Sequence, residues 1–178
     1  MNTDIWMKKL LAILGAALMG TMLATAAYAT VEQVPVEVTF VAAIGITENE
    51  TLQVGLLDVG MLVNDTVTIN TNDTFSESAS NVVGGNQRAA LLTITAEGLV
   101  GITITAGNVL GATHYTLDTW LCSYASGADT ACTTGTPYNL TSDPSGSATL
   151  DVGVTLTGLG GASAGNDDST FDVTVTYQ

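Results

Sequence analysis

The last residues of the chain carry the pattern that most restricts its fold. Every second position from 171 to 177 is apolar, and the row consists of Phe171, Val173, Val175 and Tyr177. Successive side chains of a β-strand point to opposite faces, so this spacing predicts a half-buried strand that reaches the carboxyl end. Because the strand supplies core residues, we expect the fold to close only when the end of the chain is in place.

A second segment of the same kind lies near the other end of the chain. Every second position from 34 to 46 is apolar, and the row begins with Val34, Val36, Val38 and Phe40. This spacing predicts a strand within residues 31–47. Two interpretations stay open, since the strand can be the first strand of its own domain or a donor strand that a neighbouring subunit takes up. Either way it has to be covered, because a bare apolar edge strand promotes aggregation.

Alternating segments also recur between these two ends, and Gly, Asn and Asp residues separate them. They cover residues 52–57, 67–69, 92–96, 102–105, 115–120 and 150–156. Short strands with such turns predict an all-β, Ig-like β-sandwich. We expect residues 92–96 and 102–105 to pair as a hairpin, and residues 122–146 to form a long loop.

The amino terminus has the layout of a Sec signal peptide. Lys8 and Lys9 precede the apolar stretch 10–23, and Ala27-Tyr28-Ala29 fits a small-x-small cleavage site. We therefore expect residues 1–29 to be removed and residues 30–178 to form a single extracellular domain. The apolar stretch is short for a membrane-spanning helix, and we expect no membrane span in the mature chain.

The charge balance excludes one broad class of partner. The chain has 17 Asp and Glu residues against three Lys and Arg residues, which gives a net charge of −14. Lys8 and Lys9 belong to the expected signal peptide, so Arg88 is the only Lys or Arg residue of the mature chain. Nucleic-acid binding needs basic residues to neutralise phosphates, and we predict none.

The two cysteines, Cys122 and Cys132, predict a disulfide. In an exported chain, two cysteines ten positions apart are expected to close a local ring. Zinc is the alternative, but two thiols and the distant His114 are too few ligands for a closed zinc site.

The order of the strand motifs resembles the DUF4402 family, a bacterial exported domain family of unknown function. The resemblance covers most of the mature chain, and its motifs are Leu52-Gln53-Val54-Gly55, 90–95, 101–104, 149–156 and 170–178. The chain departs from the family pattern in three places, one of which is the Cys122/Cys132 loop. Val54 stands where the family prefers Phe, and Gly165–Ser169 replaces the family's Gly-Thr-Tyr-x-Gly. The resemblance implies a secreted β-sandwich.

The terminal strand with its penultimate tyrosine is also similar to the ending of chaperone–usher pilins. That similarity implies a pilin-like sandwich whose groove, lined by Phe171, Val173, Val175 and Tyr177, receives the row Val34, Val36, Val38 and Phe40 of a neighbour. The expected function is a structural subunit of an extracellular filament or pilus. The expected partners are further copies of the chain, a periplasmic chaperone and an outer-membrane usher.

Other kinds of site find less support. We predict no enzyme, because the Gly-x-Ser-x-Gly motif at 161–165 precedes a strand, and the lone His114 lies upstream of it. We predict no cofactor, although the oxygen-rich pairs Asn64-Asp65 and Asn72-Asp73 and the run 166–168 leave calcium open. The alternative function is a monomeric surface module that binds carbohydrate through Trp120, Tyr115 or Tyr138.

Overall fold

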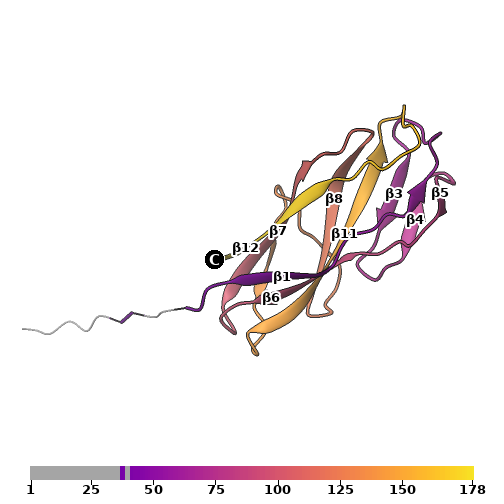
Figure 1. Ribbon diagram of the computed structural model, residues 1–178. Helices are drawn as coiled ribbons and strands as arrows, with labels where there is room; N and C mark the ends of the chain where they lie inside the picture. Colours follow the sequence, from indigo (N-terminus) through magenta and orange to yellow (C-terminus); the bar gives the residue numbers. More distant parts are fainter. Residues whose placement is uncertain (1–36, 39–40) are drawn as a thin grey trace, which may run out of the picture. The chain divides into compact units, whose positions relative to one another are not determined.

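The computed structural model describes residues 37–38 and 41–178, and their regular secondary structure consists of β-strands (Figure 1). The all-β fold is therefore confirmed. The strands are β1 (Gly45–Glu50), β2 (Leu56–Leu57), β3 (Thr66–Ile69), β4 (Phe75–Glu77), β5 (Val82–Gly84), β6 (Ala90–Thr95), β7 (Gly101–Leu110), β8 (Tyr115–Tyr124), β9 (Thr130–Ala131), β10 (Tyr138–Thr141), β11 (Ser147–Gly158) and β12 (Thr170–Tyr177). Within this part of the chain, a search for helices long and apolar enough to cross a membrane finds none.

The larger sheet has seven strands and is organised around β11. Along one edge, β11 pairs with β6 through residues 147–152 and then with β3 through residues 154–157. Along the other edge, β8 pairs with β11 from Leu150 to Gly158. The outer strands are β1 beside β6, β4 beside β3, and β9 beside β8. All of these pairings are antiparallel, as expected for strands that alternate between apolar and polar residues.

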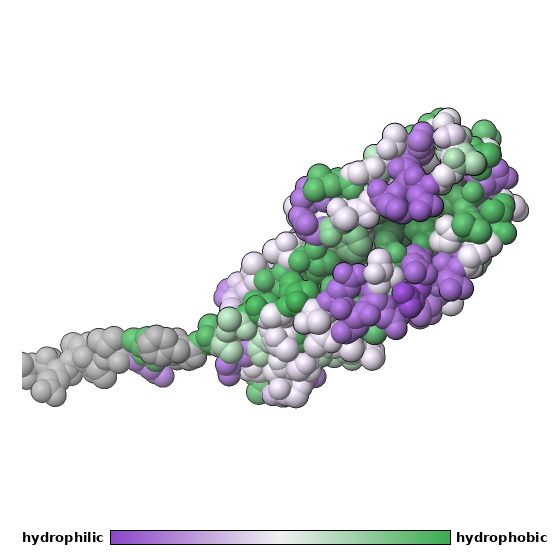
Figure 2. All heavy atoms as spheres, viewed as in Figure 1, coloured by the Kyte–Doolittle hydropathy of each residue, from purple (hydrophilic) through white to green (hydrophobic). Residues whose placement is uncertain are grey.

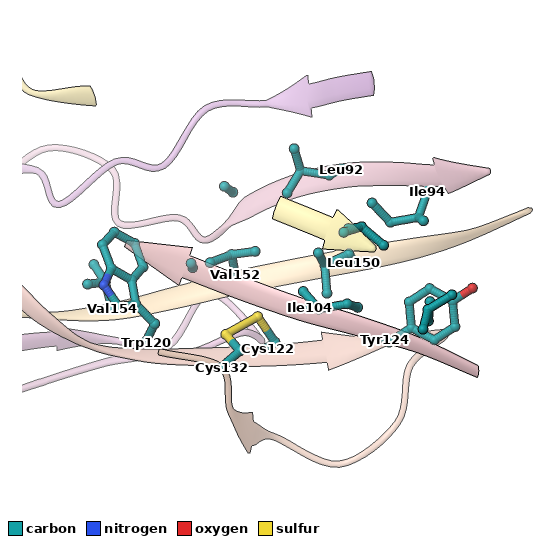
Figure 3. Packing of buried hydrophobic residues seen from close by; sticks show 14 of the residues in the cluster. Leu92, Ile94, Ile104, Trp120, Cys122, Tyr124, Cys132, Leu150, Val152 and Val154 are labelled. Atoms are coloured by element: carbon teal, nitrogen blue, oxygen red, sulfur yellow. A yellow bond between two sulfur atoms is a disulfide. The ribbon is translucent and has the colours of Figure 1, made fainter. Parts of the chain in front are cut away.

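The smaller sheet has the order β10-β7-β12 and packs against the larger one. Its core-facing residues include Ile102, Ile104 and Val175, which meet Trp120 and Leu150 of the larger sheet in one buried cluster. Figure 3 shows Ile104, Trp120, Leu150 and the disulfide packed in this cluster between the sheets. The arrangement is a β-sandwich, with an additional two-stranded sheet of β2 and β5.

The expected hairpin between residues 92–96 and 102–105 is wrong. β6 pairs with β1 and β11, whereas β7 pairs with β10 and β12, so the chain crosses from one sheet to the other between them. Both strands alternate in the expected way, and both bury one face. Alternation reports which face is buried and carries no information about the pairing partner.

The region 122–146 contains more than the expected loop. β10 is an edge strand of the smaller sheet, and β9 pairs with β8. The Cys132 amide donates to the Trp120 carbonyl over 3.1 Å, and the Ala106 amide donates to the Cys132 carbonyl over 2.6 Å. This segment therefore bridges β8 and β7, which belong to different sheets. The predicted Cys122–Cys132 disulfide is confirmed, with 5.8 Å between the two Cα atoms.

The boundaries of the first strands also differ from the expected ones. β1 begins only at Gly45, and residues 41–44 belong to no strand. From the expected strand at 52–57, only Leu56–Leu57 is assigned, although Gln53 makes an isolated bridge to Arg88. The expected signal peptide, 1–29, and the donor-row residues Val34, Val36 and Phe40 lie outside the described residues.

Candidate functional site

The two sheets leave two free edges next to each other, those of β1 and β12. β1 is the outermost strand beside β6, and β12 is the outermost strand beside β7. They approach each other at one end, where the Tyr177 hydroxyl donates to the Ala42 carbonyl over 2.7 Å. Figure 2 shows a hydrophobic band along this face of the domain, bordered by hydrophilic residues. We call the strip of surface between the free edges of β1 and β12 the seam.

The β12 side of the seam consists of core side chains, three of which are only partly buried. Val173 pairs with Ala106, and Val175 pairs with Ile104. Directly paired residues of neighbouring strands point to the same face, so Val173 and Val175 face the core. Ala106 and Ile104 are fully buried on the inner strand, whereas Val173, Phe171 and Tyr177 are only partly covered and Val175 lies at the border of burial.

The β1 side has the same property. Ile46 pairs with Ile94, and Glu48 pairs with Leu92. Ile94 is completely buried and faces the core, so Ile46 points to the core side as well, yet 41% of Ile46 is exposed. The core-directed side of both edge strands is therefore incompletely covered: on β1 Ile46 is exposed and Glu48 faces the same way, and on β12 Phe171, Val173 and Tyr177 are partly exposed.

Tyr177 joins the two edges at one end of the seam. Its hydroxyl accepts a hydrogen bond from the Glu97 amide over 2.7 Å and donates one to the Ala42 carbonyl over the same distance. The Tyr177 hydroxyl thus uses both its donor and an acceptor site, and the Tyr177 ring packs on the core cluster. The sequence placed Tyr177 in a core-lining row but gave no sign of this bridge, because its partners lie 80 and 135 positions away.

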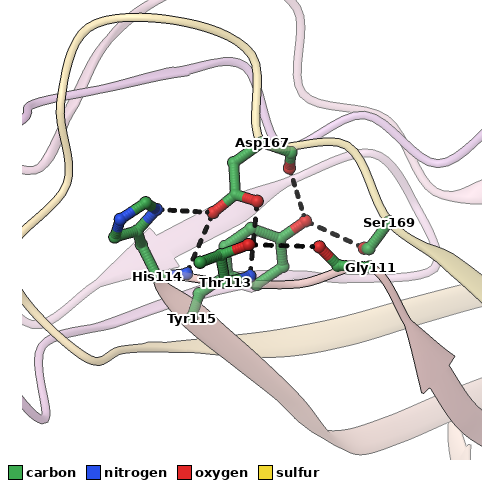
Figure 4. Close-up of polar contacts among 6 residues, drawn as sticks. All are labelled: Gly111, Thr113, His114, Tyr115, Asp167 and Ser169. Carbon is green, nitrogen blue, oxygen red and sulfur yellow. Dashed lines mark hydrogen bonds and ion pairs between the residues drawn. The ribbon is translucent and has the colours of Figure 1, made fainter.

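A polar cluster holds the loop that precedes β12 at the other end (Figure 4). Asp167 accepts hydrogen bonds from the His114 amide and pairs with its Nδ1, both over 2.9 Å, and it also accepts from the Thr113 amide over 3.3 Å. The Tyr115 hydroxyl donates to the Asp167 carbonyl and shares a hydrogen bond with Ser169 Oγ, both over 2.8 Å. Burial acts to raise the pKa of the Asp167 carboxyl, but the hydrogen bonds from His114 and Thr113 outweigh it and the pKa is lowered. The cluster thus fixes the start of β12.

The predicted groove residues Phe171, Val173, Val175 and Tyr177 all contact the core cluster from β12. The Phe171 ring packs on Trp120, with 4.4 Å between the ring centroids. Among the predicted donor-row residues, Val38 is the only one within the described part of the chain. It belongs to no strand, and 64% of it is exposed.

The aromatic residues that the carbohydrate-binding alternative would use do not form an exposed platform. Only 2% of Trp120 is exposed, so Trp120 presents almost no ring surface on which a sugar could stack. The Tyr115 hydroxyl is engaged by the loop before β12, and Tyr138 packs against the core.

Three of the Asx residues considered for calcium accept hydrogen bonds from backbone amides. Asp65 Oδ2 accepts from the Leu62 amide over 3.0 Å, Asn72 Oδ1 from the Thr74 amide over 3.2 Å, and Asp73 Oδ1 from the Ala89 amide over 2.9 Å. Across residues 37–38 and 41–178, no group of three or more His, Cys, Asp or Glu residues is placed to hold a metal ion. The Gly-x-Ser-x-Gly motif, 161–165, lies in the loop before β12.

One acidic residue occupies the middle of the larger sheet. Asp151 on β11 pairs with Leu91 and Ser123 on the two flanking strands. Burial, followed by the nearby charges of Asp73, Asp129 and Glu50, raises the pKa of the Asp151 carboxyl. Ionised Asp151 therefore opposes folding to some degree.

Comparisons with protein-family models, with curated proteins and with solved structures found no match to this chain. The resemblance to the DUF4402 family and to pilins remains a prediction from the sequence motifs.

Proposed function

We propose that this protein is a structural subunit of an extracellular filament and that its subunits join by strand addition. The observation that carries the proposal is the seam, in which two neighbouring edge strands expose core-directed side chains. A monomer that ends its sheets this way leaves free backbone donors and acceptors beside uncovered apolar surface, and both invite an added strand.

The occupant that fits the seam is the N-terminal row of a second copy. An inserted strand presents every second side chain to the core, and Val34, Val36, Val38 and Phe40 supply apolar side chains at that spacing. Polar Glu37 and Thr39 would point outward. The row ends a few residues before β1, so each copy carries one donor segment and one seam, which is sufficient for an unbranched chain of subunits.

Export and assembly partners follow from the same proposal. A signal peptide at 1–29 would take the chain across the membrane through the Sec pathway. A seam that is open before assembly needs a temporary cover, and a periplasmic chaperone with an outer-membrane usher would supply the cover and the place of exchange. The acidic surface would keep subunits apart until strands are exchanged.

The test compares two neighbouring positions of the donor row. Mature filaments recovered from the native cell surface should give a ladder on unheated SDS gels and a single band after heating. Val38→Asp places a charge on the inserted face and should abolish both ladder and filaments, whereas Thr39→Asp places the same charge on the outward face and should preserve them. Because Val38 is 64% exposed, its substitution should leave the domain's own unfolding midpoint unchanged.

Two results would refute strand addition by this row. One is a wild-type chain that gives only discrete particles and no ladder, which would favour a monomeric binding module. The other is a ladder that survives Val38→Asp as well as it survives Thr39→Asp.

A further inference from the structure

The long strand β11 defines two ends of the domain. Ser147 at its start pairs with Thr95, which in turn pairs with Gly45, so this end also contains the root of the N-terminal segment. We call it the base. Gly158 at the other end of β11 pairs with Tyr115, close to the start of β12, and we call this end the tip. β11 has 12 residues, and at roughly 3.3 Å per step the eleven steps from Ser147 to Gly158 separate the two ends by about 36 Å.

The tip carries a patch of exposed aliphatic side chains, Leu62, Val63 and Leu159. They are 68%, 59% and 48% exposed. The backbone holds them together, since the Asn64 amide donates to the Gly158 carbonyl over 3.0 Å, next to Leu159. A Cβ placed on Gly160 would lie 3.1 Å from Val63 Cγ2, which sets Val63 against the same turn. Neighbouring exposed apolar residues of this kind mark a contact surface more often than isolated ones do.

The base carries an apolar projection beside a hollow. Leu99 is 71% exposed and has a φ of 62°. A leucine in the left-handed region is strained, and Gly or Asn would occupy the position at lower cost. Leu99 contributes little to its own core, so neither packing nor local geometry explains the choice of leucine. Leu99 also lines a shallow hollow, together with residues of the segments 42–43, 95–98 and 144–146.

The short connection between donor row and β1 determines which surfaces meet, if subunits join as proposed above. Only residues 41–44 separate Phe40 from Gly45, so the body of the donor subunit has to lie directly at the mouth of the seam it fills. At the base, that mouth is occupied by the acceptor's own segment, because Ala42 is bound there by Tyr177. The donor body therefore has to lie at the tip, with its inserted strand antiparallel to β12.

We propose that the tip patch of one subunit packs into the base hollow of the next, against Leu99. This inference rests on strand addition, but it adds a second interface that strand addition by itself does not require. The inserted strand holds two subunits together, and the tip-to-base contact sets the angle between them. Successive copies then repeat one head-to-tail relation, which generates a regular filament.

Crosslinking tests the contact directly. The described cysteines are both in the disulfide, so an introduced pair of cysteines provides the reactive thiols. Filaments of the full mature chain carrying Leu62→Cys and Leu99→Cys, treated with a short bismaleimide, should give a ladder that survives boiling with reductant. The matched control pairs Leu99→Cys with Thr119→Cys, an exposed position in β8 between the two ends, and should give no such ladder.

The outcomes separate the two proposals. Two results would overturn the tip-to-base contact and leave strand addition standing. In the first, the Leu62→Cys/Leu99→Cys chain gives a heat-sensitive ladder but no products that survive boiling. In the second, the control chain gives as many boiling-resistant products as the Leu62→Cys/Leu99→Cys chain. Absence of any wild-type ladder would overturn both. As a second readout, Leu99→Asn should leave the domain at least as stable as the wild type, because Asn tolerates this φ, while its filaments lose their straight and regular course. Wild-type filament order in Leu99→Asn would contradict the contact.

Discussion

Removing the disulfide should weaken the sandwich at the point where its two sheets are joined. The ring closed by Cys122 and Cys132 spans a sequence separation of 10, for which the chain-entropy relation gives about 2.7 kcal/mol at 25 °C. Both cysteines are fully buried, so the bond restrains a packed region and not a surface loop. For a domain of this size, at roughly 3 °C per kcal/mol, the melting temperature should fall by about 8 °C.

The measurement is urea unfolding of the mature domain, followed by tryptophan fluorescence. Trp120 is the only tryptophan after the expected signal peptide, and it lies in the core beside the bridging segment. Oxidised wild type is compared with reduced wild type, and Cys122→Ala/Cys132→Ala with and without reductant controls for the reductant itself. Amide exchange should increase first at Cys132 and Ala106, whose amides form the bridge between β8 and β7. If reduction shifts the free energy of unfolding by less than about 0.5 kcal/mol, the crosslink does not restrain the unfolded chain as argued.

Three further perturbations test other parts of the structure. Tyr177→Phe removes one accepted and one donated hydrogen bond at the end of the seam and should cost about 1–3 kcal/mol in the free energy of unfolding; a change below the error of a urea titration would contradict the bridge. Gly153→Ala would push a Cβ into the Ile69 carbonyl oxygen on the neighbouring strand and should lower the free energy of unfolding by about 1–3 kcal/mol. An unchanged melting curve would contradict this and show that the two strands can move apart without cost. Asp151→Asn should raise the urea midpoint at pH 7, because the pKa of the Asp151 carboxyl is raised in the folded protein and its charge opposes folding. This gain should disappear as the pH falls below 3.8, the ordinary pKa of an Asp carboxyl, because the carboxyl is then neutral in both states. A gain that does not depend on pH would refute the electrostatic cause.

Several elements could be predicted from alternation alone. The terminal row at 171–177 became β12, the row at 150–156 lies within β11, and the pair Val67 and Ile69 lies in β3. The disulfide also followed from composition, because the chain is expected to be exported and its two cysteines have one evident pairing. These predictions succeeded since each depends on local spacing or on a choice with few alternatives.

The candidate site was only partly predictable. The sequence identified the core-lining row of β12, but it gave no sign that β1 would stop beside it without pairing. It placed a strand over residues 31–47, whereas β1 starts at Gly45 and residues 41–44 belong to no strand. The exposed Leu99 and the bridge made by Tyr177 were missed, because both depend on segments brought together from distant positions.

Local patterns in the sequence were enough to predict that this chain forms strands, which of their faces are buried, and that the protein is strongly acidic. A two-residue period tells which side chains lie on each face of a strand. It does not tell which neighbouring strand pairs with it, because any strand with the same alternation is an equally suitable partner. The tertiary structure alone decided that β6 and β7 belong to different sheets and that β1 and β12 end as neighbouring free edges. Pairing depends on loop closure and on the packing of all strands together, so the open seam is a property of the assembled sandwich and of no single segment.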